Sequence, residues 1–217
     1  WDRYAWRTDH WRPTAELSFA VDRMLYGLRP AGYRLTNVLI HFGTAAGVFL
    51  LSLALLDSTA AALAASLLFL LSHVATQPLY GSVANRTDSL AGLFGILSVY
   101  LFVRFRRQPR FRTCACLIVC LGLALLSKES ALTVPLTFVL HDVLFPEFRG
   151  TKPWRVHLVP IGLMLCYLGL RIVLLGSVGS AGEAGQPVLW ETVTANLRGA
   201  LTTLFMPAIP PFAVRRR

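Results

Sequence analysis

The stretch SHVATQPLYGSVANRTD, residues 72–88, places a cluster of polar side chains between two apolar runs. The run before it, residues 60–72, and the run after it, residues 90–103, are both shorter than the roughly 20 residues that cross a bilayer. Short helices around a polar segment suit a re-entrant region that faces protein or water, because lipid-exposed irregular backbone is not tolerated. The polar members are His73, Gln77, Asn85, Arg86 and Asp88. Ionisable groups at a membrane boundary are costly, so we interpret this stretch as a candidate functional site.

The composition of the chain is that of an integral membrane protein. The 217 residues are 55% hydrophobic and 15% charged, whereas soluble domains carry about 25% charged residues. A net charge of +10 would suggest nucleic-acid binding in a soluble protein. Here the arginines gather in loops between apolar runs, which favours the positive-inside rule and contact with anionic headgroups. We therefore expect membrane lipids, and no nucleic acid, among the partners.

The pattern of apolar runs predicts an all-α, polytopic membrane protein in three parts. Residues 1–34 are predicted to form a non-cytoplasmic loop, residues 35–175 a transmembrane bundle, and residues 176–217 a second non-cytoplasmic loop. The sequence starts at Trp1 rather than Met, so we expect a fragment whose last part is truncated.

Two surface helices and two full spans are predicted within these parts. Residues 14–28 have apolar side chains at helical spacing, which predicts an amphipathic surface helix with Thr14 as its N-cap. Residues 35–56 and 158–175 are long enough to span. Residues 190–206 predict a second surface helix.

Two basic loops give the predicted orientation. Residues 104–112 hold five arginines, and residues 146–157 add three Lys or Arg. Counting crossings places both loops on one side, which is therefore predicted to be cytoplasmic. The six arginines of residues 1–34 argue against this, but four acidic residues accompany them. All the candidate site residues then fall on the non-cytoplasmic face.

Two further positions carry cations that could bind phosphate. Arg12 precedes Pro13 at the start of the surface helix, and arginine suits bidentate phosphate binding. The alternative is an interfacial arginine that snorkels among headgroups. Lys128 and Glu129 interrupt an apolar run. They could be a phosphate-binding lysine with its orienting carboxylate, or an interfacial ion pair at a helix break.

The remaining polar residues also allow two interpretations each. Asn37 and His41 lie one helical turn apart and share a face, where they could bond a neighbouring helix, the commoner role, or line a cavity. Asp88 could cap a helix and pair with Arg86. Alternatively, both could join His73 in binding a phosphate or a metal, or in stabilising an anionic leaving group.

The order of four motifs is specific. WRPT, GLRPAGYRLTNVLIH, HVATQPLYGSVANRTDSLAGLF and LLSKESALTVP follow one another within residues 10–145. This order resembles the membrane domain of the transmembrane O-mannosyltransferases that carry C-terminal tetratricopeptide repeats, and of their bacterial relatives. Both belong to the GT-C class of glycosyltransferases. The resemblance implies a GT-C-like helical bundle that transfers a mannose-like sugar from a polyprenyl-phosphate donor to a protein or glycan hydroxyl on the non-cytoplasmic face.

The resemblance also implies roles for individual residues. Arg12 matches the Arg or His before Pro in the family's first large loop, and Lys128 matches its S-K motif. Asn37 and His41 match an N-x-x-x-H helix. The residues predicted to bind the donor phosphate are Arg12, Arg86 and Lys128, supported by His41, His73, Asp88 and Glu129. The general base of the family lies before the Arg-Pro motif, which places it upstream of Trp1, so no catalytic residue is assigned. No metal ligand is assigned either, and a divalent cation stays open as a cofactor.

Two departures from the family pattern affect the predicted function. Val74 stands where the family has Pro, and Pro78 stands where it has Glu. If that glutamate helps to bind the donor or a metal, this chain is altered or inactive. The alternative functions are a non-catalytic membrane scaffold or assembly protein of the same fold, and a transporter of lipid-linked sugars. The predicted location is a bacterial plasma membrane, or the endoplasmic reticulum membrane in a eukaryote.

Overall fold

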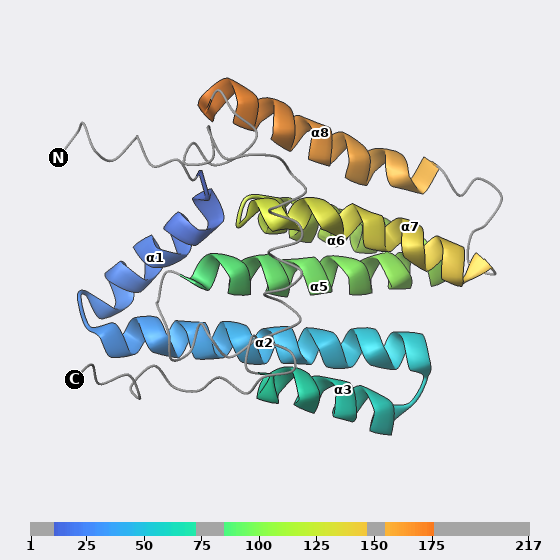
Figure 1. Cartoon of the computed structure of the whole chain (residues 1–217), viewed down its shortest axis with the longest axis horizontal. Coiled ribbons are helices and arrows are strands. Elements are labelled where there is room, and N and C mark those ends of the chain that lie inside the picture. Colours follow the sequence, from blue (N-terminus) through green and yellow to red (C-terminus); the bar gives the residue numbers. More distant parts are fainter. Residues whose placement is uncertain (1–10, 73–84, 147–154, 176–217) are drawn as a thin grey trace, which may run out of the picture. The chain divides into compact units, whose positions relative to one another are not determined.

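The computed structural model describes residues 11–72, 85–146 and 155–175, and every regular element within them is a helix (Figure 1). In chain order the elements are α1 (Pro13–Tyr26), α2 (Pro30–Leu56), α3 (Thr59–Leu71), α5 (Arg86–Arg107), α6 (Phe111–Leu125), the 3-10 helix η2 (Glu129–Thr133), α7 (Val134–Leu144) and α8 (Arg155–Leu175). The predicted all-α fold is confirmed. Contacts divide the chain into Trp1–Val178 and Gly179–Arg217, and all the described residues belong to the first unit. The predicted helix over residues 190–206 lies outside the described residues.

Within the described residues, three helices are long and apolar enough to cross a membrane: Pro30–Leu56, Arg86–Arg107 and Val156–Leu174. Only 22%, 33% and 17% of their apolar windows are buried inside the protein, so most of each apolar window is left uncovered. The predicted polytopic membrane protein is therefore confirmed. The prediction of a short helix over residues 90–103 is wrong, because α5 extends it at both ends through charged residues.

Helix α1 begins one residue earlier than predicted. Pro13 occupies its first turn, where a missing N–H costs nothing, and Arg12 is the N-cap. Thr14 is therefore not the N-cap. Its hydroxyl instead donates to the Leu123 carbonyl at 3.3 Å, and its backbone N–H bonds the Leu126 carbonyl at 3.3 Å. These bonds tie the start of α1 to the end of α6.

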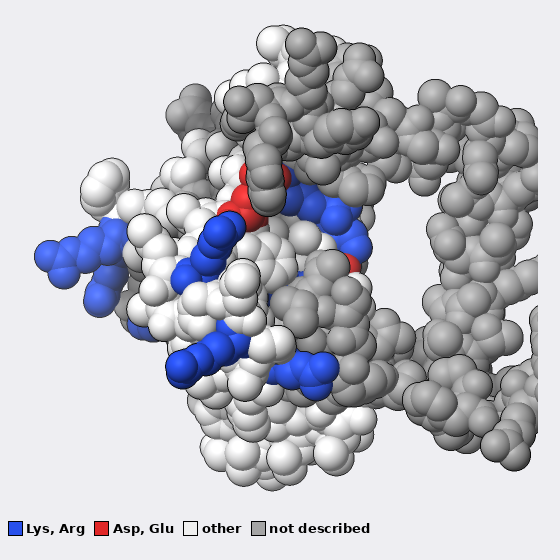
Figure 2. All heavy atoms as spheres, turned by 90° about the vertical axis from the view of Figure 1, so that its left-hand side faces the viewer, with Lys and Arg blue, Asp and Glu red and all other residues white. Residues whose placement is uncertain are grey.

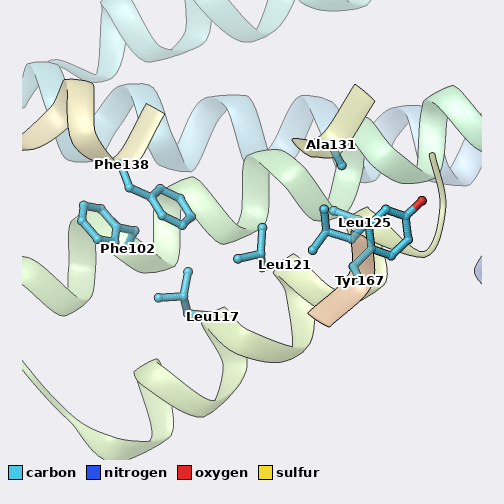
Figure 3. Close-up of a cluster of buried hydrophobic side chains, with 8 residues drawn as sticks. Phe102, Leu117, Leu121, Leu125, Ala131, Phe138 and Tyr167 are labelled. Atoms are coloured by element: carbon cyan, nitrogen blue, oxygen red, sulfur yellow. The ribbon is translucent and has the colours of Figure 1, made fainter. Parts of the chain in front are cut away.

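Helix α5 is central to the packing, because it contacts α2 on one side and α6 on the other (Figure 1). The largest buried cluster joins α5, α6, η2, α7 and α8, and most of its side chains are drawn in Figure 3. Phe102 and Phe138 stack in it, with ring centroids 4.5 Å apart. Helices α2 and α5 approach closely at Gly47, where a Cβ would lie 2.9 Å from Cγ2 of Ile96.

Candidate functional site

Two ionic clusters lie where α1 meets the first turn of α5 and the break after α6. The first, called here the Arg86 cluster, consists of Arg86, Asp22, Asn37, Ser18, Tyr33 and Phe19. The second, called here the Glu129 cluster, consists of Arg12, Glu129, Arg171, Lys128 and Asp88. Figure 2 views this end of the described unit and shows acidic atoms flanked by lysine and arginine side chains.

The Arg86 guanidinium is enclosed by protein. Its side chain is 0% exposed, and its Nη1 lies 2.6 Å from Oδ2 of Asp22, which is 3% exposed. Nε donates to Oδ1 of Asn37 at 2.6 Å, and Nη2 donates to the Tyr33 carbonyl at 2.8 Å. Cζ of the guanidinium lies over the Phe19 ring, 4.3 Å from its centroid. A buried charge with this many partners binds α5 to α1 and α2.

Two polar residues on α2, Asn37 and His41, make different kinds of contact. Asn37 bonds Arg86 across the α2–α5 interface, which confirms the helix–helix interpretation for this residue. His41 is 6% exposed and stacks on Phe69 of α3, with ring centroids 5.1 Å apart. The Nε2 atom of His41 is buried and has no hydrogen-bond partner among the described residues.

Glu129 lies between two arginines that are far apart in the sequence, Arg12 and Arg171. Its Oε2 accepts from Nη2 of Arg12 at 3.1 Å, and its Oε1 lies 2.7 Å from Nη2 of Arg171. Arg171 comes from α8, is 1% exposed, and also donates to the Tyr167 hydroxyl at 3.0 Å. The Tyr167 ring in turn stacks on Trp11 at 6.4 Å. The carboxylate thus links the start of α1, the break after α6 and the last turns of α8.

Lys128 pairs with the first turn of α5. Helix α6 ends at Leu125, and the backbone of Lys128 is extended before η2 begins. The Lys128 side chain is therefore not part of either helix. Its Nζ pairs with Oδ1 of Asp88 in the first turn of α5. The Lys128 side chain is 28% exposed and that of Asp88 51%, so this pair is open to solvent or ligand, unlike the Arg86 cluster.

Two opposing effects set the protonation of Glu129. Partial burial alone would raise its pKa, but a bond from the backbone, the Arg171 side chain and the Arg12 charge together hold the pKa below its ordinary value. The carboxylate is therefore ionised at neutral pH and keeps both arginines in place.

The predicted site residues fall into two groups. Arg12, Lys128, Glu129 and Asp88 come together in the Glu129 cluster, whereas Arg86 turns inward to Asp22. Arg86 pairs with Asp22 and Asp88 pairs with Lys128, in place of the Arg86–Asp88 pair that the sequence suggests. The helix break at residues 128–129 is confirmed, although the two side chains pair elsewhere rather than with each other. His73 lies outside the described residues.

Arg171, which is part of the Glu129 cluster, was not predicted as a site residue. A signal for it was present in the sequence, because an arginine within an otherwise apolar span is costly and normally has a partner. Asp22, the partner of Arg86, was not predicted either. Among the residues that the structure describes, no group of three or more His, Cys, Asp or Glu side chains is placed to hold a metal ion.

Comparison with known proteins places the chain in a family. Residues 19–174 match the family described as dolichyl-phosphate-mannose-protein mannosyltransferase. The chain belongs to this family. The matched range contains Arg86, Lys128, Glu129 and Arg171, and Arg12 lies just before it.

Individual relatives of this mannosyltransferase family come from animals. The chain is 39% identical over 142 residues to protein O-mannosyl-transferase Tmtc1 of Drosophila melanogaster, which covers 64% of this chain and 16% of that protein. It is 29% identical over 206 residues to Tmtc2 of the same species, and this match covers 91% of the chain and 22% of that protein. It is 30% identical over 216 residues to TMTC2 of Mus musculus, with 91% and 26% covered. The chain thus spans about a quarter or less of these relatives. No solved structure matches.

Proposed function

We propose that this chain is part of a glycosyltransferase that moves a mannose-like sugar from a polyprenyl-phosphate donor to a protein or glycan hydroxyl on the non-cytoplasmic face. Its family and the names of its relatives support mannosyl transfer. The observation that carries the proposal is the Glu129 cluster, which gathers Arg12, Lys128 and Arg171 at one end of the bundle.

The charge of the cluster suits a donor phosphate. Its three cations face two carboxylates, Glu129 and Asp88, which leaves one net positive charge among these residues. The side chains of Arg12 and Lys128 are 21% and 28% exposed, so an anion can approach both. The existing carboxylates hold these cations in position before a phosphate arrives, which lowers the cost of ordering them.

A small apolar cavity lies beside the cluster. It has a volume of about 130 Å³ and is lined by residues of α6 and α8, including Leu126, Leu163 and Tyr167. Tyr167 connects the two features, since its ring lines the cavity and its hydroxyl accepts from Arg171. A polyprenyl chain is apolar and its phosphate is anionic, so the donor could place its chain along α6 and α8 with the phosphate at Arg12.

The chemistry assigned to these residues is stabilisation of the leaving group. Attack of an acceptor hydroxyl on the anomeric carbon breaks the bond to the phosphate oxygen, and negative charge develops on that oxygen. Lys128 and Arg12 would stabilise this charge most strongly in the transition state. Arg86 has its partners within the protein, so in this proposal it holds α5 in place and does not touch the donor. The base that deprotonates the acceptor is assigned to no residue here.

The same relatives support a proposed location. The chain is an integral membrane protein, and the relatives named above are animal proteins. We place a eukaryotic member in the membrane of the endoplasmic reticulum, with the Glu129 cluster on the lumenal side. Positive charge in the loops of residues 104–112 and 146–157 supports this orientation.

The proposal can be tested with the full-length protein and polyprenyl-phosphate mannose in detergent micelles. Lys128→Gln and Arg12→Gln should each lower the rate of mannose release or transfer by about 10²-fold, the usual effect of removing one such donor. Arg23→Gln is the matched control, because it removes an exposed arginine from the last turn of α1. Unchanged rates in both Lys128→Gln and Arg12→Gln, with normal thermal stability, would contradict the proposal.

A non-catalytic scaffold is the second candidate, and Pro78 at the position of the family's glutamate favours it. A scaffold would neither bind nor cleave the donor. Binding of a photoreactive polyprenyl-phosphate mannose separates the two functions without knowledge of the acceptor. Labelling that depends on Lys128 supports a donor site, and labelling no higher than that of an unrelated membrane protein supports the scaffold.

A further inference from the structure

A second cavity lies at the opposite ends of α2 and α5, away from the Glu129 cluster. It has a volume of about 350 Å³ and is lined by both helices, with Leu50, Leu53 and Asp57 on the α2 side. The α5 side contributes Tyr100, Arg104 and Arg107. Small-molecule sites in proteins have volumes of roughly 300–1,000 Å³, so the space suits a headgroup-sized ligand. It is called here the Arg104 cavity.

The cavity lies at a membrane boundary. Helices α2 and α5 are both long and apolar enough to span, and they end beside it at Leu56 and Arg107. Its lining changes from apolar to charged along the helix axes, because Leu53 and Leu50 precede Asp57 by about one and two turns respectively. Positive charge in the adjoining loop predicts that this end faces the cytoplasm.

The two arginines are held so that they face the same space. Nη1 of Arg104 donates to the Tyr100 hydroxyl at 3.2 Å, and its guanidinium lies 5.8 Å from the ring centroid of that tyrosine. Nη2 of Arg107 donates to the Ala54 carbonyl at the end of α2. Arg104 and Arg107 are both exposed, and Asp57 is the charged lining residue of opposite sign. The charges that line the cavity therefore sum to one positive.

We propose that the Arg104 cavity binds the phosphate headgroup of an anionic glycerophospholipid. Arginine pairs well with phosphate because its planar guanidinium donates two parallel bonds. A soluble anion would use only these cations, whereas a lipid would also place its glycerol backbone and first methylenes against Leu50 and Leu53. The cavity lies at the ends of two spanning helices. The headgroup of a lipid in the adjacent leaflet therefore lies beside the arginines and needs no channel through the protein to reach them. This site is separate from the proposed sugar-donor site and does not depend on it.

The test measures retention of phosphatidylglycerol by the full-length protein in detergent micelles, using native mass spectrometry over a lipid titration. Arg104→Gln should weaken binding about tenfold, the effect of losing one hydrogen bond to a charged group. Arg107→Gln should do the same. Arg110→Gln is the matched control, because Arg110 is exposed at the end of the same basic segment and does not line the cavity.

Asp57→Asn should strengthen lipid binding, whereas the two arginine substitutions should weaken it. Asp57 has φ 50° at the end of α2, a left-handed conformation that asparagine tolerates, so the backbone should not change. Removing its negative charge should tighten binding of phosphatidylglycerol, which has no amine to pair with a carboxylate.

Three outcomes would overturn the proposal. Equal weakening by Arg110→Gln would show diffuse attraction to basic residues rather than a site. Equal retention of phosphatidylcholine would show that the charge of the lipid does not matter. Displacement of the lipid by millimolar inorganic phosphate would show a site for a soluble anion. Weakening confined to Arg104→Gln and Arg107→Gln, with tightening by Asp57→Asn, supports the lipid site.

Discussion

The Arg86 cluster and the Glu129 cluster adjoin the same end of α5, but they differ in exposure. In the Arg86 cluster both members of the ion pair are almost fully buried, at 0% and 3% exposure. In the Glu129 cluster the paired side chains other than Arg171 are 21% to 51% exposed. A buried pair cannot exchange its partner for a ligand, whereas an exposed pair can. The same residue types therefore serve to hold the fold in one cluster and remain available for binding in the other.

The largest expected effect comes from breaking the buried pair. Asp22→Asn keeps the shape of the side chain but leaves the Arg86 charge uncompensated in the interior, and the new amide N–H₂ group would face the guanidinium. Removing one partner of a buried pair typically costs about 3–5 kcal/mol. We expect a loss of that size in the free energy of unfolding, measured by thermal or denaturant unfolding in detergent.

The matched control for this change is Asp88→Asn. It makes the same substitution in the Asp88–Lys128 pair, where the carboxylate is 51% exposed. Exposed pairs contribute about 0–1 kcal/mol, so stability should fall by less than about 1 kcal/mol. Equal losses from the two variants would show that the difference in burial between the clusters has no energetic consequence.

Arg171→Gln should have an intermediate effect, because Arg171 is buried but its partner Glu129 is 25% exposed. The change leaves the Tyr167 hydroxyl without its donor and Glu129 with Arg12 alone. We expect a loss of about 2 kcal/mol, which is the cost of an unmade bond to a charged group. Unfolding in detergent provides the measurement.

Tyr167→Phe separates the two contributions of Arg171. It removes only the hydroxyl that accepts from Arg171, while the ring keeps its stacking on Trp11. The expected loss is about 1 kcal/mol or less. If Tyr167→Phe costs as much as Arg171→Gln, then the hydroxyl bond rather than the ion pair with Glu129 anchors α8.

The helices could be predicted from the sequence, because apolar runs and their interruptions are local signals. The runs over residues 35–56 and 158–175 correspond to α2 and α8, and the break at Lys128 is confirmed. The length of α5 could not be predicted in this way. Its first turn contains Arg86 and Asp88, which lie outside the apolar run of residues 90–103, so the extent of the helix is clear only once the partners of these charges are known.

The pairing of charges was the part that sequence could not supply. Arg86 has an acidic residue two positions away, yet it pairs with Asp22 on another helix. Side chains two apart on a helix do not face each other, whereas packing of α1 on α5 brings Asp22 within reach. Grouping Arg12 with Lys128 was possible because their motifs occur in a family order. Adding Arg171 required the position of α8.

The smallest expected effect concerns the pH dependence of the exposed cluster. The pKa of Glu129 lies below its ordinary value in the folded protein, against about 4.3 in the unfolded chain. Its ionisation therefore stabilises the fold above the unfolded value, and this contribution is lost as the pH falls through the lower folded-state pKa. Glu129→Gln should be less stable than the unmodified protein at pH 7 by about 1 kcal/mol or less. The difference should shrink as the pH is lowered below 4, when the native glutamate also becomes neutral, as measured by unfolding in detergent across that range.

In an Arg171→Gln background the difference in stability between the unmodified Glu129 form and the Glu129→Gln form should already be smaller at pH 7, because one of the two cations that lower the pKa has gone. A difference that stays constant with pH, or that Arg171→Gln leaves unchanged, would show that the two arginines do not stabilise the ionised carboxylate.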